Sequence, residues 1–114
     1  MYRQGQPCTP FSLSFISDVS GKHNTAIPIS LRYTGFPPFP VRAEFVVSNC
    51  PAAFDCTKQT KSFSAAMPSP LAGSYICKTA STTPTTKLIL DVQLIDADGI
   101  KTVIQRPQVT CTKP

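Results

Sequence analysis

The stretch that decides the fold is residues 27–47, IPISLRYTGFPPFPVRAEFVV. Apolar and polar side chains alternate over residues 27–33 and again over residues 41–47. A period of two places one face of a strand on a core and the other in water, so we expect two half-buried strands here. The core face should hold Ile27, Ile29, Leu31, Tyr33, Val41, Ala43, Phe45 and Val47, and the face toward water Pro28, Ser30, Arg32, Arg42, Glu44 and Ser48.

A proline-rich corner, Gly35-Phe36-Pro37-Pro38-Phe39-Pro40, joins the two runs. The glycine permits a positive φ, while the prolines fix φ and remove the N–H donors that a continuing sheet would need. The chain should therefore leave one strand, turn stiffly and begin another in a different sheet. This arrangement predicts a β-sandwich.

Length and composition agree with one all-β domain. A chain of 114 residues is long enough for a single core without a metal. No window of a dozen residues carries an apolar stripe of helical spacing that is free of proline and glycine. Twelve prolines and a charged share of only 15% are common in extracellular and periplasmic β modules.

The rest of the chain supplies further strands and turns. We expect an extended lead-in over residues 1–10, one domain over residues 11–114, and a turn region over residues 18–25. The strongest strand should be residues 87–96, KLILDVQLID, followed by a hairpin turn at Ala97-Asp98-Gly99. The remaining strands are expected at residues 11–17, near Phe63, at residues 73–79 and at residues 101–111. About seven strands with regular turns predict an immunoglobulin-like two-sheet sandwich.

Charge and hydropathy argue against two classes of partner. The net charge is +5, but the eleven Lys and Arg residues are scattered singly along the chain. Proteins that bind nucleic acid gather such charges on one face, so we expect no nucleic-acid partner. No apolar run reaches the length of a transmembrane helix, so direct membrane insertion is not expected either.

The cysteines indicate an oxidising compartment. Five cysteines are many for a cytosolic chain of this size, none stands in a Cys-x-x-Cys pair, and the only histidine is His23. We expect Cys50 and Cys56 to close the short loop CPAAFDC, and Cys8 and Cys111 to join the two ends of the domain. Cys77 would then remain unpaired and buried. The location would be extracellular, periplasmic or in the lumen of an organelle.

The segment GSYIC, residues 73–77, resembles the Gly-x-Tyr-x-Cys signature of immunoglobulin domains. In that family the tyrosine forms a corner and the cysteine bridges the two sheets. Residues 27–33 contain no partner cysteine and the chain has no tryptophan. Since another strand follows at residues 87–96, we expect the segment to lie one strand earlier than in the family. The resemblance is therefore to immunoglobulin-like domains in the broad sense.

Two further segments resemble parts of known families. Residues 29–45 are similar to the strand, proline corner and strand of immunoglobulin-like repeats, including the lumenal repeats of the nuclear-pore membrane ring protein and bacterial cell-surface repeats. The segment LDVQLIDADGIKTVI is similar to the core strand and turn of chaperone–usher pilins, with no evident donor strand. Both resemblances imply an assembly or surface module.

No constellation of residues predicts an enzyme. Asp96 and Asp98 offer two carboxylates to a calcium ion, but Asp-Gly turns use the same residues for backbone hydrogen bonds. His23 lies in a segment rich in turn residues, without a nucleophile elbow, so we interpret it as a solvated loop residue. We therefore expect no catalytic residues, no metal and no cofactor.

The proline corner is the one place where the sequence predicts binding. A rigid apolar loop loses little entropy on docking, so Phe36, Pro37, Pro38 and Phe39 form our candidate binding site. The alternative is that Phe36 or Phe39 plugs the end of the sandwich, and we favour this for Phe39. The function that we expect is a non-catalytic immunoglobulin-like module acting as an adhesion, spacer or assembly unit. Its partner would be another protein or neighbouring copies. The alternative is a stand-alone secreted binder or inhibitor that presents disulfide-fixed loops.

Overall fold

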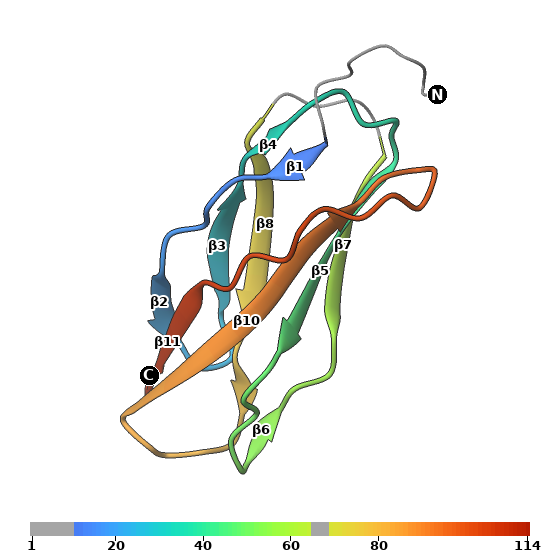
Figure 1. Cartoon of the computed structure of the whole chain (residues 1–114). Coiled ribbons are helices and arrows are strands. Elements are labelled where there is room, and N and C mark those ends of the chain that lie inside the picture. The colour runs from blue at the N-terminus through green and yellow to red at the C-terminus, as the bar shows by residue number, and fades with distance from the viewer. Residues whose placement is uncertain (1–10, 65–68) are drawn as a thin grey trace.

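The protein is described from a computed structural model, which defines residues 11–64 and 69–114. The described part contains strands and no helix (Figure 1). In chain order the strands are β1 (Ser12–Leu13), β2 (Val19–Lys22), β3 (Ala26–Leu31), β4 (Tyr33–Thr34), β5 (Val41–Val47), β6 (Phe54–Asp55), β7 (Gln59–Phe63), β8 (Leu71–Ile76), β9 (Lys78–Thr79), β10 (Thr85–Ile95) and β11 (Gln108–Thr112).

The long strand β10 lies at the centre of a five-stranded sheet with the order β2-β11-β10-β5-β7. It pairs with β11 on one side and β5 on the other, both antiparallel, and β2 joins β11 in parallel. The inward side chains of β10 have no exposed surface, which confirms the prediction of a central strand. They are Leu88, Leu90, Val92 and Leu94. The predicted turn after β10 is also present, and Gly99 takes the positive φ that it was expected to need, at 83°.

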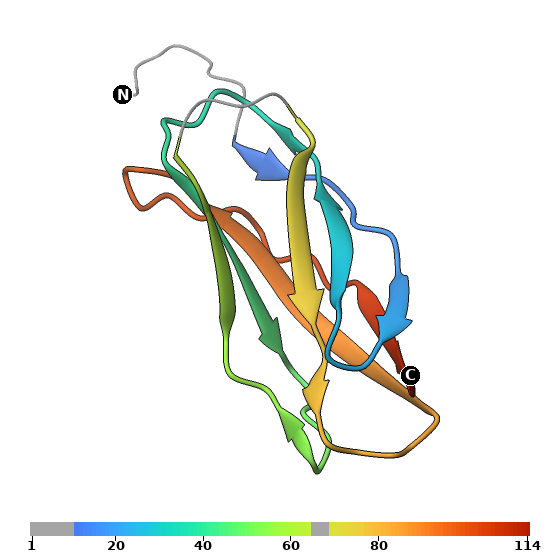
Figure 2. The ribbon, with the colours of Figure 1, turned by 180° about the vertical axis from the view of Figure 1, so that it is seen from behind.

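A two-stranded sheet, β3 paired with β8, lies across the core from the five-stranded sheet (Figures 1 and 2). The side chains of β3 and β8 join those of β5 and β10 in one hydrophobic cluster. The rings of Phe45 on β5 and Tyr75 on β8 are 6.5 Å apart. A Cβ atom on Gly73 would lie 3.2 Å from the Phe45 ring and 3.2 Å from the backbone oxygen of Ile29, so this position leaves little room for a side chain.

The N-terminal strand is shorter than predicted, and the chain that follows it runs to the other sheet. Residues 11–17 were expected to form one strand with Phe15 inward, but β1 ends at Leu13 and pairs with β4. The chain then crosses to the other sheet, and this crossing changes the alternation, so Phe15 is 79% exposed and Ile16 only 3%. The predicted turn at residues 18–25 is confirmed only over residues 23–25, where Asn24 has a φ of 59°, because β2 occupies residues 19–22 and pairs with β11.

The structure joins Cys50 to Cys56, the short-loop pairing expected from the sequence, and it joins Cys77 to Cys111. The expected pairing of Cys111 with Cys8 and a free Cys77 is therefore wrong; Cys8 itself lies outside the described residues. The error has a physical reason. The chain enters β1 near one end of the long axis, whereas β11 ends near the other (Figure 1). Cys111 is fully buried and points across the core toward the end of β8.

Amide side chains take the place of missing strands at three points. Gln59 donates to the oxygen of Ile76 at 2.7 Å and accepts from its nitrogen at 3.0 Å. Asn24 makes the same pair of bonds with the backbone of Thr79, at 2.8 and 3.1 Å. Asn49 donates to the oxygen of Lys87 and accepts from the nitrogen of Ile89. Each amide thus satisfies backbone groups that no neighbouring strand reaches.

Candidate binding surface

The proline corner presents one phenylalanine to solvent and places the other against the core. Phe36 is 95% exposed, the largest exposure among the large apolar side chains of the described residues. Phe39 packs at the edge of the core, with its ring 6.5 Å from that of Tyr33. The interpretation of Phe39 as a plug at the end of the sandwich is consistent with this packing. Phe36 is left as the side chain that a partner would meet.

A glycine turn and a backbone hydrogen bond position the corner. Gly35 has a φ of 93°, which turns the chain out of β4. The oxygen of Pro38 accepts a hydrogen bond of 3.1 Å from the nitrogen of Ala97, in the turn that follows β10. This bond fixes the corner to the five-stranded sheet, so Phe36 stands on a supported loop.

Exposed apolar side chains also occur on the segment after the β10 turn. Ile100 is 57% exposed, Val103 76% and Ile104 36%. This segment leaves β10 through the turn that holds Pro38, at the same end of the molecule as the corner (Figure 1). Sequence reasoning missed these residues, because the alternation around Lys101 to Gln105 was read as an ordinary strand. The structure instead makes only isolated bridges there, at Lys101 and Gln105.

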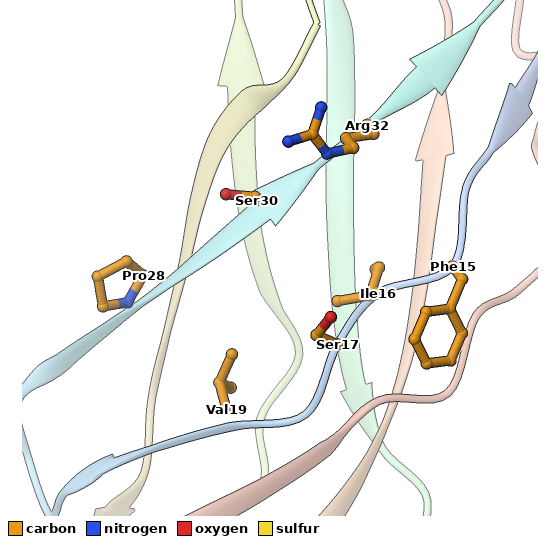
Figure 3. Close-up of a pocket in the computed structure, with 7 residues that line it drawn as sticks. All are labelled: Phe15, Ile16, Ser17, Val19, Pro28, Ser30 and Arg32. Carbon is orange, nitrogen blue, oxygen red and sulfur yellow. The ribbon is translucent and has the colours of Figure 1, made fainter.

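A groove of about 320 Å³ lies between the crossing segment and β3 (Figure 3). Phe15, Ile16 and Ser17 border it on one side, and Pro28, Ser30 and Arg32 on the other. Its lining contains no carboxylate, histidine or cysteine, so its two serines, Ser17 and Ser30, have no general base among the lining residues. No sequence pattern marks this groove, because the groove depends on where the chain crosses between the sheets.

Glu44 is a buried carboxylate on the outer face of the five-stranded sheet. It was expected to face water, but it is only 8% exposed. Burial alone would raise its pKa, but donors from Gln93, Lys58 and Arg42 together hold the pKa below its usual value. The Arg42 Nε and Lys58 Nζ atoms lie 3.2 and 3.4 Å from its carboxylate. A carboxylate held ionised by several donors is suited to a structural role and is a poor proton donor at neutral pH.

His23 is buried and was wrongly predicted to be solvated. It is 3% exposed because its backbone nitrogen bonds to Thr112, which extends the pairing of β2 with β11 and turns the ring inward. The ring meets Phe54 edge-on at 5.9 Å, and its Nε2 atom has no hydrogen-bond partner. Neither Ser nor Asp forms a hydrogen bond with it in the described residues, so it is not part of a triad there.

The Asp96 carboxylate binds the backbone of the turn after β10. The Asp96 Oδ1 atom accepts hydrogen bonds from the nitrogens of Asp98 and Ile100, at 2.9 and 3.0 Å. Within residues 11–64 and 69–114, no three His, Cys, Asp or Glu side chains gather as a metal site would require. No membrane-spanning helix is found in the same residues.

Comparisons with known proteins give no relative from which a site could be transferred. The chain matches no protein-family model and no curated protein sequence.

Proposed function

We propose that this protein is a non-catalytic, immunoglobulin-like module of an exported or lumenal protein. In immunoglobulin-like domains one sheet contains the strand order G-F-C, extended by C′ in the variable type, and faces a sheet that contains B and E. The order β11-β10-β5-β7 facing β3-β8 corresponds to that arrangement. This correspondence is the observation that carries the proposal.

The resemblance of GSYIC to the family signature takes a different form in this topology. Residues 73–77 lie on and after β8, in the position of strand E, whereas the family places the motif on strand F. Tyr75 is therefore a core residue and not a corner tyrosine, and Cys77 joins the sheets by pairing with β11. The module is immunoglobulin-like in its strand order and not in its sequence signature.

The two disulfides support an oxidising compartment, because such bonds persist in secreted, periplasmic and lumenal proteins and are rare in the cytosol. Within that setting the module acts as an adhesion, spacer or assembly unit. The domain measures 54 Å along its long axis and 23 and 21 Å across it. β1 lies near one end of this axis and β11 runs toward the other, a geometry suited to a unit in a row (Figure 1).

The contact that we propose for this unit is the proline corner, in which Phe36 is the anchor, Pro37 and Pro38 lie beside it and Phe39 packs against the core. Phe36 leaves almost all of its apolar surface in water, and the bond from Ala97 to Pro38 holds the loop in position. An aromatic anchor on a rigid support loses little conformational entropy when it docks. A neighbouring copy or another protein is the partner that such a surface fits.

Sedimentation velocity of the wild type and of Phe36→Ser, at rising concentration, tests this proposal. We expect the wild type to self-associate and Phe36→Ser to weaken the association roughly 30-fold, the effect of losing one central anchor. Phe15→Ser is the matched control, since Phe15 is also exposed but lies on the crossing segment. A wild type that stays monodisperse at every concentration would favour the alternative of a stand-alone secreted binder.

A further inference from the structure

The outer edge of β8 lies beside β7 (Figure 2). Only part of the backbone groups along this edge have hydrogen-bond partners among the described residues. β8 pairs with β3 along its other edge, with Ile76 opposite Ala26, Ser74 opposite Pro28 and Ala72 opposite Ser30. The backbone of Ile76 turns away from β3, since both of its polar groups bond to Gln59. Because this direction alternates along an antiparallel strand, Ser74 and Ala72 also point their N–H and C=O groups outward.

Two observations support this assignment of direction. The backbone oxygen of Arg32, at the end of β3, accepts a hydrogen bond of 2.8 Å from the nitrogen of Ser14. The backbone groups of the even-numbered residues of β3 therefore point away from β8. Pro28 has the same parity and has no N–H to offer, and a proline is tolerated in a sheet where its nitrogen faces an outer edge. Pro28 and Ser30, which lie opposite Ser74 and Ala72, therefore form no backbone hydrogen bonds with these two residues.

The backbone groups of this edge have hydrogen-bond partners from Ile76 onward and lack them at Ala72 and Ser74 within the described residues. The next residues along, β9, pair with β6, and Ile76 is satisfied by the amide of Gln59. Ser74 and Ala72 have no hydrogen-bond partner on this side in residues 11–64 and 69–114. The segment LAGSYI also contains no proline and no charged residue, which are the usual means of blocking an exposed edge.

A lysine stands beside the open positions. Lys61 of β7 pairs with Ala43 of β5, so it shares the inner face of the five-stranded sheet, yet it is exposed because the two-stranded layer does not cover it. Its Nζ atom lies 6.0 Å from the Phe63 ring centroid, and no carboxylate of the described residues is ion-paired with it. Gln59 is level with Ile76, so Lys61, two residues along β7, is level with Ser74.

We propose that this edge binds an extended segment of a protein partner, which adds as a strand beside β8 and carries an acidic side chain toward Lys61. The N–H and C=O groups of Ala72 and Ser74 offer four hydrogen bonds to such a strand, and main-chain bonds of this kind supply the affinity in strand addition. The uncompensated ammonium of Lys61 and the net charge of +5 select an acidic segment over a basic one. This surface is separate from the Phe36 corner, so either proposal can fail alone.

The probes are two fluorescein-labelled, end-blocked peptides of eight residues, one alternating valine with glutamate and one alternating valine with lysine. We expect the glutamate peptide to bind the folded protein in fluorescence anisotropy, and to shift and protect from exchange the amide signals of Ala72 and Ser74. The lysine peptide should bind roughly tenfold more weakly. Lys61→Glu should remove this preference, whereas Lys113→Glu, which changes the net charge equally at an exposed position near the chain end, should preserve it.

Ala72→Pro is the variant that tests the edge itself. It removes an N–H that no hydrogen bond within residues 11–64 and 69–114 uses, so the fold should persist by circular dichroism, while peptide binding is lost. Ala72→Val keeps the N–H and should bind. Three results overturn the proposal: no binding of either peptide at millimolar concentration, binding that Ala72→Pro and Lys61→Glu leave unchanged, or self-association of the protein that Ala72→Pro abolishes, which would assign the edge to a second copy.

Discussion

Gln59 shows how one side chain can stand in for a strand. Its amide reaches the backbone of β8 from β7 and satisfies one N–H and one C=O group that no other strand contacts. Asn24 and Asn49 do the same at two other open positions. Nothing in the sequence marks these three residues, because an amide in a loop or on a strand edge is common and its partner is set by the tertiary fold.

Gln59→Leu is expected to destabilise the protein by about 1–3 kcal/mol, because it keeps the approximate shape but leaves both polar groups of Ile76 unpartnered. Urea unfolding followed by circular dichroism measures the change. Ser62→Ala on the same strand is the control and should stay within about 0.5 kcal/mol of the wild type. Equal effects from both substitutions would show that the amide bonds contribute nothing.

Glu44 predicts a dependence of stability on pH. Its pKa is lowered in the folded protein, where the donors from Gln93, Lys58 and Arg42 outweigh the opposing effect of burial. A lowered folded-state pKa contributes stability above the unfolded value of about 4.3, and this contribution is lost as the pH falls through the folded value. The free energy of unfolding of the wild type should therefore fall below about pH 4.3. Glu44→Gln should show a smaller fall, and an identical fall in both proteins would contradict the role assigned to Glu44.

Among the elements, β10 and the pair β3 and β5 were predictable from sequence because each is long and alternates without interruption. The N-terminal strand was not, since Phe15 and Ile16 exchange their expected faces where the chain crosses from one sheet to the other. The alternation of residues 11–17 carries no information on that crossing. β2 was missed for a related reason: turn-forming residues can occupy an edge strand when a neighbour such as β11 supplies the hydrogen bonds.

The two disulfides differ in the length of chain that they close, and they should differ in their effect on stability. Cys77 and Cys111 are 34 residues apart, and Cys50 and Cys56 are 6 apart. Loop-closure entropy then assigns about 4 kcal/mol to the first bond and about 2 kcal/mol to the second. Replacing each pair by alanines and measuring urea unfolding checks this order. The loss from Cys77→Ala with Cys111→Ala should be the larger, and the reverse order would contradict the account.

In the molecule as a whole, the sequence predicted an all-β protein with facing sheets but misplaced its ends. The expectation that Cys8 and Cys111 join the termini assumed that the first and last strands run side by side. They do not, because β1 pairs with β4 near one end of the long axis, while β11 ends near the other and lies between β2 and β10 (Figure 1). The candidate site was predictable in part: the proline corner is visible in the sequence, whereas the open edge of β8 exists only after the sheets are assembled.

The bond between Cys77 and Cys111 is the central feature of this fold, because it joins the two facing sheets and excludes a bond between Cys8 and Cys111. A disulfide map of the unreduced protein, with free thiols alkylated before digestion, tests it directly. We expect peptides that link Cys77 to Cys111 and Cys50 to Cys56, with Cys8 alkylated. A link from Cys8 to Cys111, or alkylation of all five cysteines in the native protein, would contradict both the arrangement of the sheets and the assignment to an oxidising compartment.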